Sequence, residues 1–377
     1  MFNSKKFTML VILAVVLTAG AASAGDMNWS FYGKVHSSIN MMSNGENSQL
    51  GLTSNTSRYG FKGWAPINDE WKFVWQIEQA VNVAQGDLST NLRNTFVGFK
   101  NAKLGEVRMG RHDTPHKTLG RKTTFFFDTV GDNRSMTFGT DTREDDILAW
   151  VSPNWDGFSL FLAYQFDQDG TKLSPTAAAD AEFHAETVFS GMAAYATDDF
   201  FVGASTIMFS EAYGDMDVDG NFGDAPMVFR FAGKYMAEKF ALAASYLSVG
   251  GQYYDDFTDP ANPVFVDQTA STIGFEGLFH ANEDYDIKAG YYMADPNGDV
   301  DDDDFSLLTV GIDRNFSKAL QVYVQYAAMS YGDMAANWSL NSTNGFATGK
   351  SYSGWYNADT TSFENPYGFS FGVNYKW

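Results

Sequence analysis

The sequence has no cysteine, and this absence excludes two classes of protein at once. Neither a disulfide-stabilised scaffold nor a metal site with cysteine ligands can form without thiols. Basic residues are also scarce, because 25 Lys and Arg stand against 46 Asp and Glu, which gives a formal net charge of −21. Since binding to a phosphate backbone needs a basic surface, we expect no nucleic acid partner.

Long hydrophobic runs are missing too, except near the beginning of the chain. Two lysines there precede an apolar run from residue 7 to about residue 17, and Ala22, Ser23 and Ala24 supply the small residues of a cleavage site. The run is shorter than the about 20 apolar residues that a bilayer-spanning helix needs. We therefore predict that residues 1–24 are a cleaved signal peptide and that residues 25–377 are exported.

Aromatic residues, by contrast, are abundant: 33 Phe, 19 Tyr and 9 Trp make up 16% of the chain. With so much apolar surface to bury, intrinsic disorder is not expected. From Tyr367 to Trp377, aromatic residues and one valine alternate with Gly, Ser, Asn and Lys. A period of two places the rings on one face of a β-strand, whereas a helix would distribute them around its circumference.

The same alternation recurs along the chain, for instance in residues 71–78, 158–166, 285–291 and 320–326. We count about 16 such segments, each about 9–14 residues long. Their centres lie near residues 34, 60, 74, 97, 108, 148, 162, 191, 205, 231, 245, 274, 289, 310, 324 and 371. The pattern predicts an all-β fold in which the strands follow one another in chain order.

Connections between these segments alternate between short turns, such as 66–69 and 282–284, and long polar stretches, such as 213–225 and 332–364. A tilted strand of about 10 residues spans a bilayer, whose core forbids an open sheet edge. We therefore predict a transmembrane antiparallel up-and-down β-barrel, with rings facing lipid and polar residues facing water. A secreted soluble β-domain, with its apolar face inward, is the alternative that periodicity alone leaves open.

Several segments resemble strands of the Gram-negative general porins. FYGK at 31–34, SRYGFKG at 57–63 and RNTFVGFK at 93–100 resemble the opening strands, and LGEVRMGRH at 104–112 resembles the strand before the constriction loop. The last residue matches the family's aromatic assembly signal, with Trp377 where Phe is usual. The resemblance implies a porin β-barrel in the bacterial outer membrane, surrounded by lipid and lipopolysaccharide. It also implies a homotrimer that passes ions and small hydrophilic solutes.

Residue by residue, the resemblance also suggests a basic ladder on the inner barrel wall. Its members in this chain are Lys34, Arg58, Lys62, Arg93 and Arg143. Periodicity agrees for two of them, because Arg58 and Lys62 are four residues apart in a strand and share a face. The alternative is structural, in which these cations pair with lumenal carboxylates such as Glu78. Both roles are compatible.

The third external loop corresponds to about residues 112–142, and the resemblance implies that it folds into the lumen. Asp128 and Asp132 are then the acids expected to face the basic ladder across the constriction. The loop also carries basic residues, so which acid lines the constriction stays open. They are Arg121, Lys122 and Arg134.

We expect a general diffusion channel, with a solute-selective channel on the same fold as the alternative. A non-channel barrel serving adhesion is a further alternative. No nucleophile elbow, phosphate-binding loop or HExxH motif is present, so we expect no enzymatic activity, catalytic residue, cofactor or metal site. His112 and His116 have a metal-binding spacing only on a helix, and Pro115 between them argues against a helix there.

The excess of acid is the one indication of ion preference in the sequence. Much of it lies in long connections, including residues 213–225, 254–267 and 295–304. An acidic mouth would concentrate cations within about one Debye length, about 8 Å at physiological salt. This predicts a mild cation preference, while solvated loop charge without any effect on conduction is the alternative.

Overall fold

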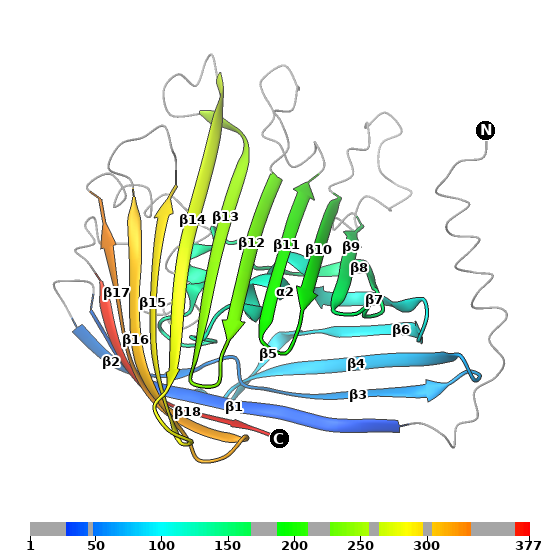
Figure 1. The fold of residues 1–377 in the computed structure, drawn as a ribbon, viewed down its shortest axis with the longest axis horizontal. Helices are drawn as coiled ribbons and strands as arrows, with labels where there is room; N and C mark the ends of the chain where they lie inside the picture. The colour runs from blue at the N-terminus through cyan, green and yellow to red at the C-terminus, as the bar shows by residue number, and fades with distance from the viewer. Residues whose placement is uncertain are drawn as a thin grey trace.

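A computed structural model describes residues 28–43, 48–166, 187–209, 227–255, 264–296, 304–332 and 366–377. The predicted signal peptide, residues 1–24, lies outside these ranges. The described residues form one antiparallel sheet in which the first strand pairs with the last, so the sheet closes on itself (Figure 1). The prediction of an all-β, up-and-down barrel is therefore confirmed.

The barrel wall contains 18 strand segments joined in chain order. They are β1 (Asn28–Ser43), β2 (Ser48–Ser54), β3 (Arg58–Pro66), β4 (Trp71–Asn82), β5 (Asp87–Leu92), β6 (Thr95–Asn101), β7 (Gly105–Asp113), β8 (Arg143–Val151), β9 (Phe158–Gln165), β10 (Val188–Ala196), β11 (Phe200–Phe209), β12 (Met227–Met236), β13 (Phe240–Asp255), β14 (Val264–His280), β15 (Tyr285–Asp295), β16 (Phe305–Asn315), β17 (Leu320–Tyr331) and β18 (Tyr367–Lys376).

Two pairs of these segments are single wall strands with a short break. β2 and β3 pair with successive halves of β1, and residues 55–57 separate them, where Thr56 adopts a φ of 58°. β5 and β6 likewise pair with successive parts of β4. Since 18 segments less two breaks leave 16 strands, the predicted number is confirmed, and every predicted centre lies within one of them.

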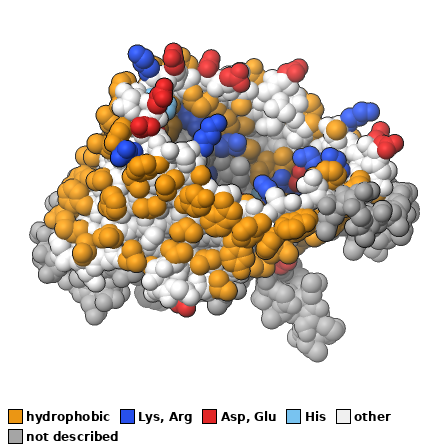
Figure 2. All heavy atoms as spheres, turned by 90° about the horizontal axis from the view of Figure 1, so that it is seen from below, with side chains coloured by type: hydrophobic (Ala, Val, Ile, Leu, Met, Phe, Trp, Pro, Cys, Tyr) orange, Lys and Arg blue, Asp and Glu red, His pale blue; other side chains and the backbone are white. Residues whose placement is uncertain are grey.

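The two faces of the wall differ as predicted for a strand between lipid and water. In β15, Ile287 and Tyr291 are 47% and 43% exposed on the outside, while Lys288, on the opposite face, is 4% exposed. Viewed from the short-turn end, apolar side chains cover the outside and Lys and Arg gather in a central hollow (Figure 2). The soluble alternative requires a polar outer face, whereas here the rings lie outside; the inward apolar residues, such as Ile147 and Phe161, cluster with Leu119 of the third loop.

The third external loop, residues 114–142, lies inside the barrel, which confirms the predicted inward fold. It contains the helix α2 (Pro115–Lys122) and the short helix η1 (Asn133–Met136), and α2 lies behind β10–β12 in Figure 1. Neither helix in the described part of the chain is long and apolar enough to cross a membrane.

The start of α2 corrects one step of the sequence reasoning. Pro115 occupies the first turn of a helix and does not prevent one, because a proline there loses no intrahelical hydrogen bond. Thr114 caps this end, since its side chain accepts a hydrogen bond from the backbone N–H of Lys117 at 3.2 Å. His112 belongs to β7 and His116 to α2, so the two do not share a helical face.

Close contacts fix the loop against the opposite wall. Phe126 is fully buried, and its ring packs over Gly290 and Gly311 of β15 and β16. A Cβ atom at either glycine would lie within about 3.4 Å of that ring. These two positions therefore need the absence of a side chain. Leu119 of α2 is also fully buried, against β11.

Candidate functional site

The barrel encloses a cavity of about 550 Å³ between the third loop and the inner wall. Its lining includes Lys34 and Arg58 from β1 and β3, and Phe125 and Phe127 from the loop. The strands from β14 to β18 supply most of the remainder, including Lys288, Asp313, Tyr323 and Lys376. Charged side chains inside and apolar side chains outside are the arrangement of an aqueous channel through lipid.

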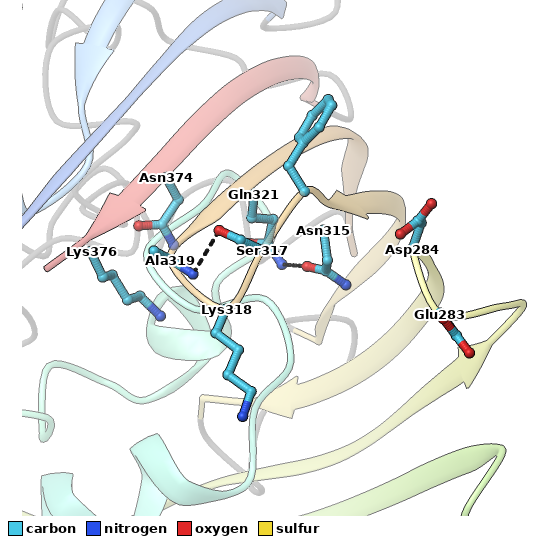
Figure 3. Close-up of a pocket in the computed structure, with 10 residues that line it drawn as sticks. Glu283, Asp284, Asn315, Ser317, Lys318, Ala319, Gln321, Asn374 and Lys376 are labelled. Atoms are coloured by element: carbon cyan, nitrogen blue, oxygen red, sulfur yellow. Dashed lines mark hydrogen bonds between the residues drawn. The ribbon is translucent and has the colours of Figure 1, made fainter.

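A second hollow of about 430 Å³ lies at the short-turn end of the barrel (Figure 3). It is lined by Glu283 and Asp284 after β14, by Lys318 after β16 and by side chains of β17 and β18. Both hollows are lined by Gln321, Asn374 and Lys376. The constriction cavity therefore adjoins the hollow at the barrel end, and Lys376 lies where they meet.

Arg58 and Arg93 of the predicted ladder meet at one carboxylate. The Nε of Arg93 lies 2.6 Å from Glu78 Oε1, and the Nε of Arg58 lies 3.4 Å from Glu78 Oε2. The hydroxyl of Tyr32 also donates to Glu78, at 3.0 Å. The structural pairing with Glu78 is therefore present, and Arg58 lines the cavity as well.

Lys62 and Arg143 have different surroundings. Lys62 is exposed, its Nζ lies 5.2 Å from the ring centroid of Tyr32, and it forms no ion pair with any described residue. The Nη2 of Arg143 lies 2.8 Å from Asp113 at the end of β7, and its Nε donates to Asn94 at 2.6 Å. Arg143 thus fixes the base of the third loop, where the chain leaves and re-enters the wall.

Asp128 joins the loop to the basic wall. Its Oδ2 lies 2.7 Å from the Nζ of Lys34 and accepts a hydrogen bond from Thr56 Oγ1 at 2.6 Å, while its Oδ1 lies 2.8 Å from Arg134. Burial alone would raise the pKa of Asp128, but Lys34, Arg121 and Arg134 outweigh burial and hold that pKa well below its usual value. Asp128 is therefore ionised and neutralised by its partners.

Asp132 lies behind Asp128 and serves the loop itself. Its carboxylate lies 2.7 Å from Arg121 and 3.2 Å from Arg134, and it accepts the backbone N–H groups of Asp128 and Arg134. Burial would raise the pKa of Asp132, yet the two arginines lower it. Of the two predicted acids, the structure therefore brings Asp128 to the wall, whereas Asp132 holds the loop's shape.

Sequence reasoning did not single out several charged residues on the other side of the loop. Arg230 of β12 lies 2.6 Å from Asp141, and both are 3% exposed. Lys288 of β15 lies 2.8 Å from Asp313 of β16. Glu276 of β14 accepts hydrogen bonds from Thr124, Tyr292 and the backbone of Phe125.

Strand parity was the available signal for those residues. Arg230, for example, alternates with Phe229 and Phe231, which are 43% and 58% exposed on the lipid side. A charged residue between two lipid-facing rings must point inward. Parity gives only the direction of a side chain, however, and its partner on the loop depends on the loop's conformation.

A sequence profile described as Gram-negative porin matches residues 10–334. The chain belongs to the Gram-negative porin family. An outer membrane porin of Bordetella pertussis is 22% identical over 76% of this chain and 78% of its own length. The outer membrane protein Omp-EA of Erwinia amylovora is 24% identical over 46% of this chain. That match spans 49% of the Erwinia protein, about half its length.

Solved porins share the fold of this porin. The anion-selective porin of Comamonas acidovorans superimposes with a TM-score of 0.70 at 17% identity, covering 93% of this chain and all of that one. OmpF of Salmonella typhi, solved with daunomycin, gives 0.63 at 16% identity, covering 93% of this chain and 97% of that one. Porins are outer membrane channels and not enzymes, and this porin is an outer membrane protein of the same kind.

Proposed function

We propose that this porin is a general diffusion channel that passes ions and small hydrophilic solutes passively across the outer membrane. The observation that carries the proposal is a charged cavity inside a barrel whose outer face is apolar, adjoining a second hollow at the short-turn end. The third loop narrows the lumen beside Lys34 and Arg58 and thereby sets the size limit. No bond is made or broken in this process.

The five residues of the basic ladder do not contribute equally to the pore lining. Lys34 and Arg58 line the cavity, whereas Lys62, Arg93 and Arg143 are proposed to line the approach to it. On the loop, Asp128 is the acid that contributes to the field across the constriction, and Asp132 supports it. Facing charges of opposite sign order water and favour polar solutes that align with the field.

The charges in the lumen further support a preference for anions. The acidic connections between the strands predict the opposite, a preference for cations. Most of those acids lie outside the described residues. The cavity lining contains four basic residues and two acidic ones. The basic residues are Lys34, Arg58, Lys288 and Lys376, and the acidic ones are Asp286 and Asp313. Lys34 and Lys288 pair with Asp128 and Asp313, while Arg58 and Arg93 share one carboxylate, that of Glu78, so the excess positive charge rests on Lys376 and on the two arginines. Salt screens charges at the mouth of the channel within about 8 Å, but it screens charges between the low-dielectric walls of the lumen much less. We therefore propose that the lumenal charges determine whether the channel prefers anions or cations. The Comamonas relative is named as anion-selective, which agrees.

Planar-bilayer recording of the purified protein tests both parts of the proposal. Stepwise conductance in KCl is expected, with a reversal potential on the chloride side in a salt gradient. If the protein inserts into the bilayer but no conductance is measured, the channel function is contradicted. A reversal potential on the potassium side would contradict the anion preference alone and support the acidic mouth as the determinant.

We also propose a homotrimer embedded in lipid and lipopolysaccharide. The lipid-facing side of β1 and β3 carries Trp29, Phe31 and Phe61, all more than a third exposed, which gives a broad apolar surface for a second copy or for acyl chains. OmpT of Vibrio cholerae, which shares the fold, was solved in a trimer form. Chemical cross-linking in native membranes should give a species of three chains, and a monomer alone would contradict this.

We further propose that residues 1–24 are removed on export. The mass of the mature chain tests this proposal.

A further inference from the structure

We propose that the constriction cavity contains a binding subsite for aromatic carboxylates, in which the ring of the solute covers Phe127 and its carboxylate meets Lys376 and Arg58. The inference rests on the proposed channel function and narrows it to one class of solute. It follows from a phenyl ring and an uncompensated cation that face the same cavity.

The aromatic part of the subsite comes from the third loop. Phe125 and Phe127, two residues apart, both line the cavity, and Phe127 is 41% exposed there. The guanidinium carbon of Arg121 lies 3.5 Å from the ring centroid of Phe127 and so supports the ring from within the loop. A half-exposed ring held in place beside water gains free energy when another ring covers it.

The anionic part of the subsite comes from the wall. Lys376 lines the cavity and forms no ion pair with any residue that the structure describes. It lies directly opposite Lys34 in the β1–β18 register, an arrangement that is unfavourable for two like charges. Asp128 neutralises Lys34, so the uncompensated charge of this pair is that of Lys376.

Arg58 adds a second donor to the same part of the cavity. It shares Glu78 with Arg93, which holds that carboxylate at the shorter distance, 2.6 Å against 3.4 Å. The Nη1 of Arg58 donates to the backbone carbonyl of Thr56 at 3.1 Å, so Nη2 is the donor of Arg58 that remains for the carboxylate of a solute. An incoming anion between Arg58 and Lys376 would offset the charge of both.

Size and chemistry together select the solute class. A cavity of about 550 Å³ lies within the usual range of small-molecule sites, about 300–1,000 Å³. A short aliphatic carboxylate would satisfy Lys376 but leave the Phe127 ring uncovered. A neutral arene would cover the ring but leave the cation without a partner. An aromatic carboxylate such as benzoate does both.

The test is chloride current through single channels in KCl as sodium benzoate is added, with acetate and benzyl alcohol as matched probes. Benzoate is expected to lower the current in a saturable way, with a half-effect concentration about five- to tenfold below that of either matched probe. Equal effects of benzoate and acetate, or of benzoate and benzyl alcohol, would overturn the inference. So would the absence of any benzoate effect on a channel that conducts normally.

Two substitutions place the effect in the cavity. Phe127→Leu and Lys376→Gln should each raise the half-effect concentration of benzoate about fivefold, and Lys103→Gln, on an exposed turn away from both hollows, should leave it unchanged. Titration calorimetry of the detergent-solubilised protein with benzoate measures the subsite without conduction. Binding heat from a non-conducting protein would support the subsite while contradicting the channel, and a conducting protein without binding heat would overturn the subsite alone.

Discussion

On the side that faces β10–β16, the third loop buries Leu119 and Phe126 completely, whereas on the side that faces β1–β3 it meets the wall through the ion pair of Lys34 and Asp128. The packed side has the shape of a protein core, with loop side chains fitted over glycines of the wall. The ionic side borders the cavity with Lys34 and Arg58, and β15, β16 and β18 add Lys288, Asp313 and Lys376 to the same lining. The loop is thus held mainly by buried side chains on one side and by an ion pair on the other.

The largest effect should come from the packed side. Replacing Phe126 by Ala removes a fully buried ring, and such a change costs about 3–5 kcal/mol in a close-packed site. Because only the loop depends on this contact, we expect local undocking and not unfolding of the barrel. Hydrogen exchange of residues 114–142 should accelerate, and single-channel current should become larger and noisier.

Phe127→Ala is the matched control for that experiment. The same atoms are removed one residue further along the loop, but from a ring that is 41% exposed, so loop docking should change by less than about 1 kcal/mol. Equal acceleration of hydrogen exchange in both variants would show that the loop is not held by packing against β15 and β16.

A smaller effect is expected when the ionic side is broken. Asp128→Asn leaves Lys34 buried without its carboxylate, which should weaken loop docking by about 1–3 kcal/mol. Lys34→Met should cost less, because Asp128 keeps Arg134 at 2.8 Å. A double-mutant cycle on hydrogen exchange measures the coupling between the two positions, and additive effects would show that the pair contributes nothing.

The pH dependence of the ionic side follows from the lowered pKa values of Asp128 and Asp132. A group whose pKa is lowered in the folded state stabilises that state above its unfolded pKa, about 3.9, and loses this contribution as the pH falls through the folded value. Channel current should therefore stay constant from pH 7 to about pH 4 and become noisy only below it. Asp128→Asn should abolish most of the transition, because the titrating carboxylate that contacts Lys34 is gone, and noise that begins near pH 6 in the unaltered protein would contradict the assignment.

The fold could be predicted from sequence because lipid and water impose the same rule on every strand. The alternation at Tyr367–Trp377 and at residues 285–291 indicates which face of each strand contacts hydrocarbon. This pattern can be recognised in either segment without knowing which distant residues contact it. The breaks at residues 55–57 and after Leu92 could not be predicted in this way. Each break shifts the register by one residue, so the lipid-facing residues are even-numbered in β2, such as Leu50 and Leu52, and odd-numbered in β3, such as Phe61.

The site was harder to predict than the fold, for a physical reason. The inward direction of Lys34 and Arg58 follows from parity, but their partners do not, because Asp128 reaches Lys34 only through the conformation of a loop 94 residues further along the chain. The same holds for Asp141, which reaches Arg230 across the lumen. Sequence pattern therefore identifies which charges face the lumen and leaves open which of them remain uncompensated.

The smallest effect is expected from the uncompensated charge of Lys376. Lys376→Gln removes one cation where the two hollows meet, on the ionic side of the lumen, without touching any contact that holds the loop. A partly screened charge contributes about 0.2–1 kcal/mol, so the ratio of chloride to potassium permeability should fall about twofold while hydrogen exchange of the loop stays unchanged. Lys103→Gln, which removes the same charge from the exposed short turn between β6 and β7, should leave the ratio as it is. If both variants lowered the ratio equally, net charge of the protein and not the position of Lys376 would set ion preference, and the ionic side of the lumen would have no special role in conduction.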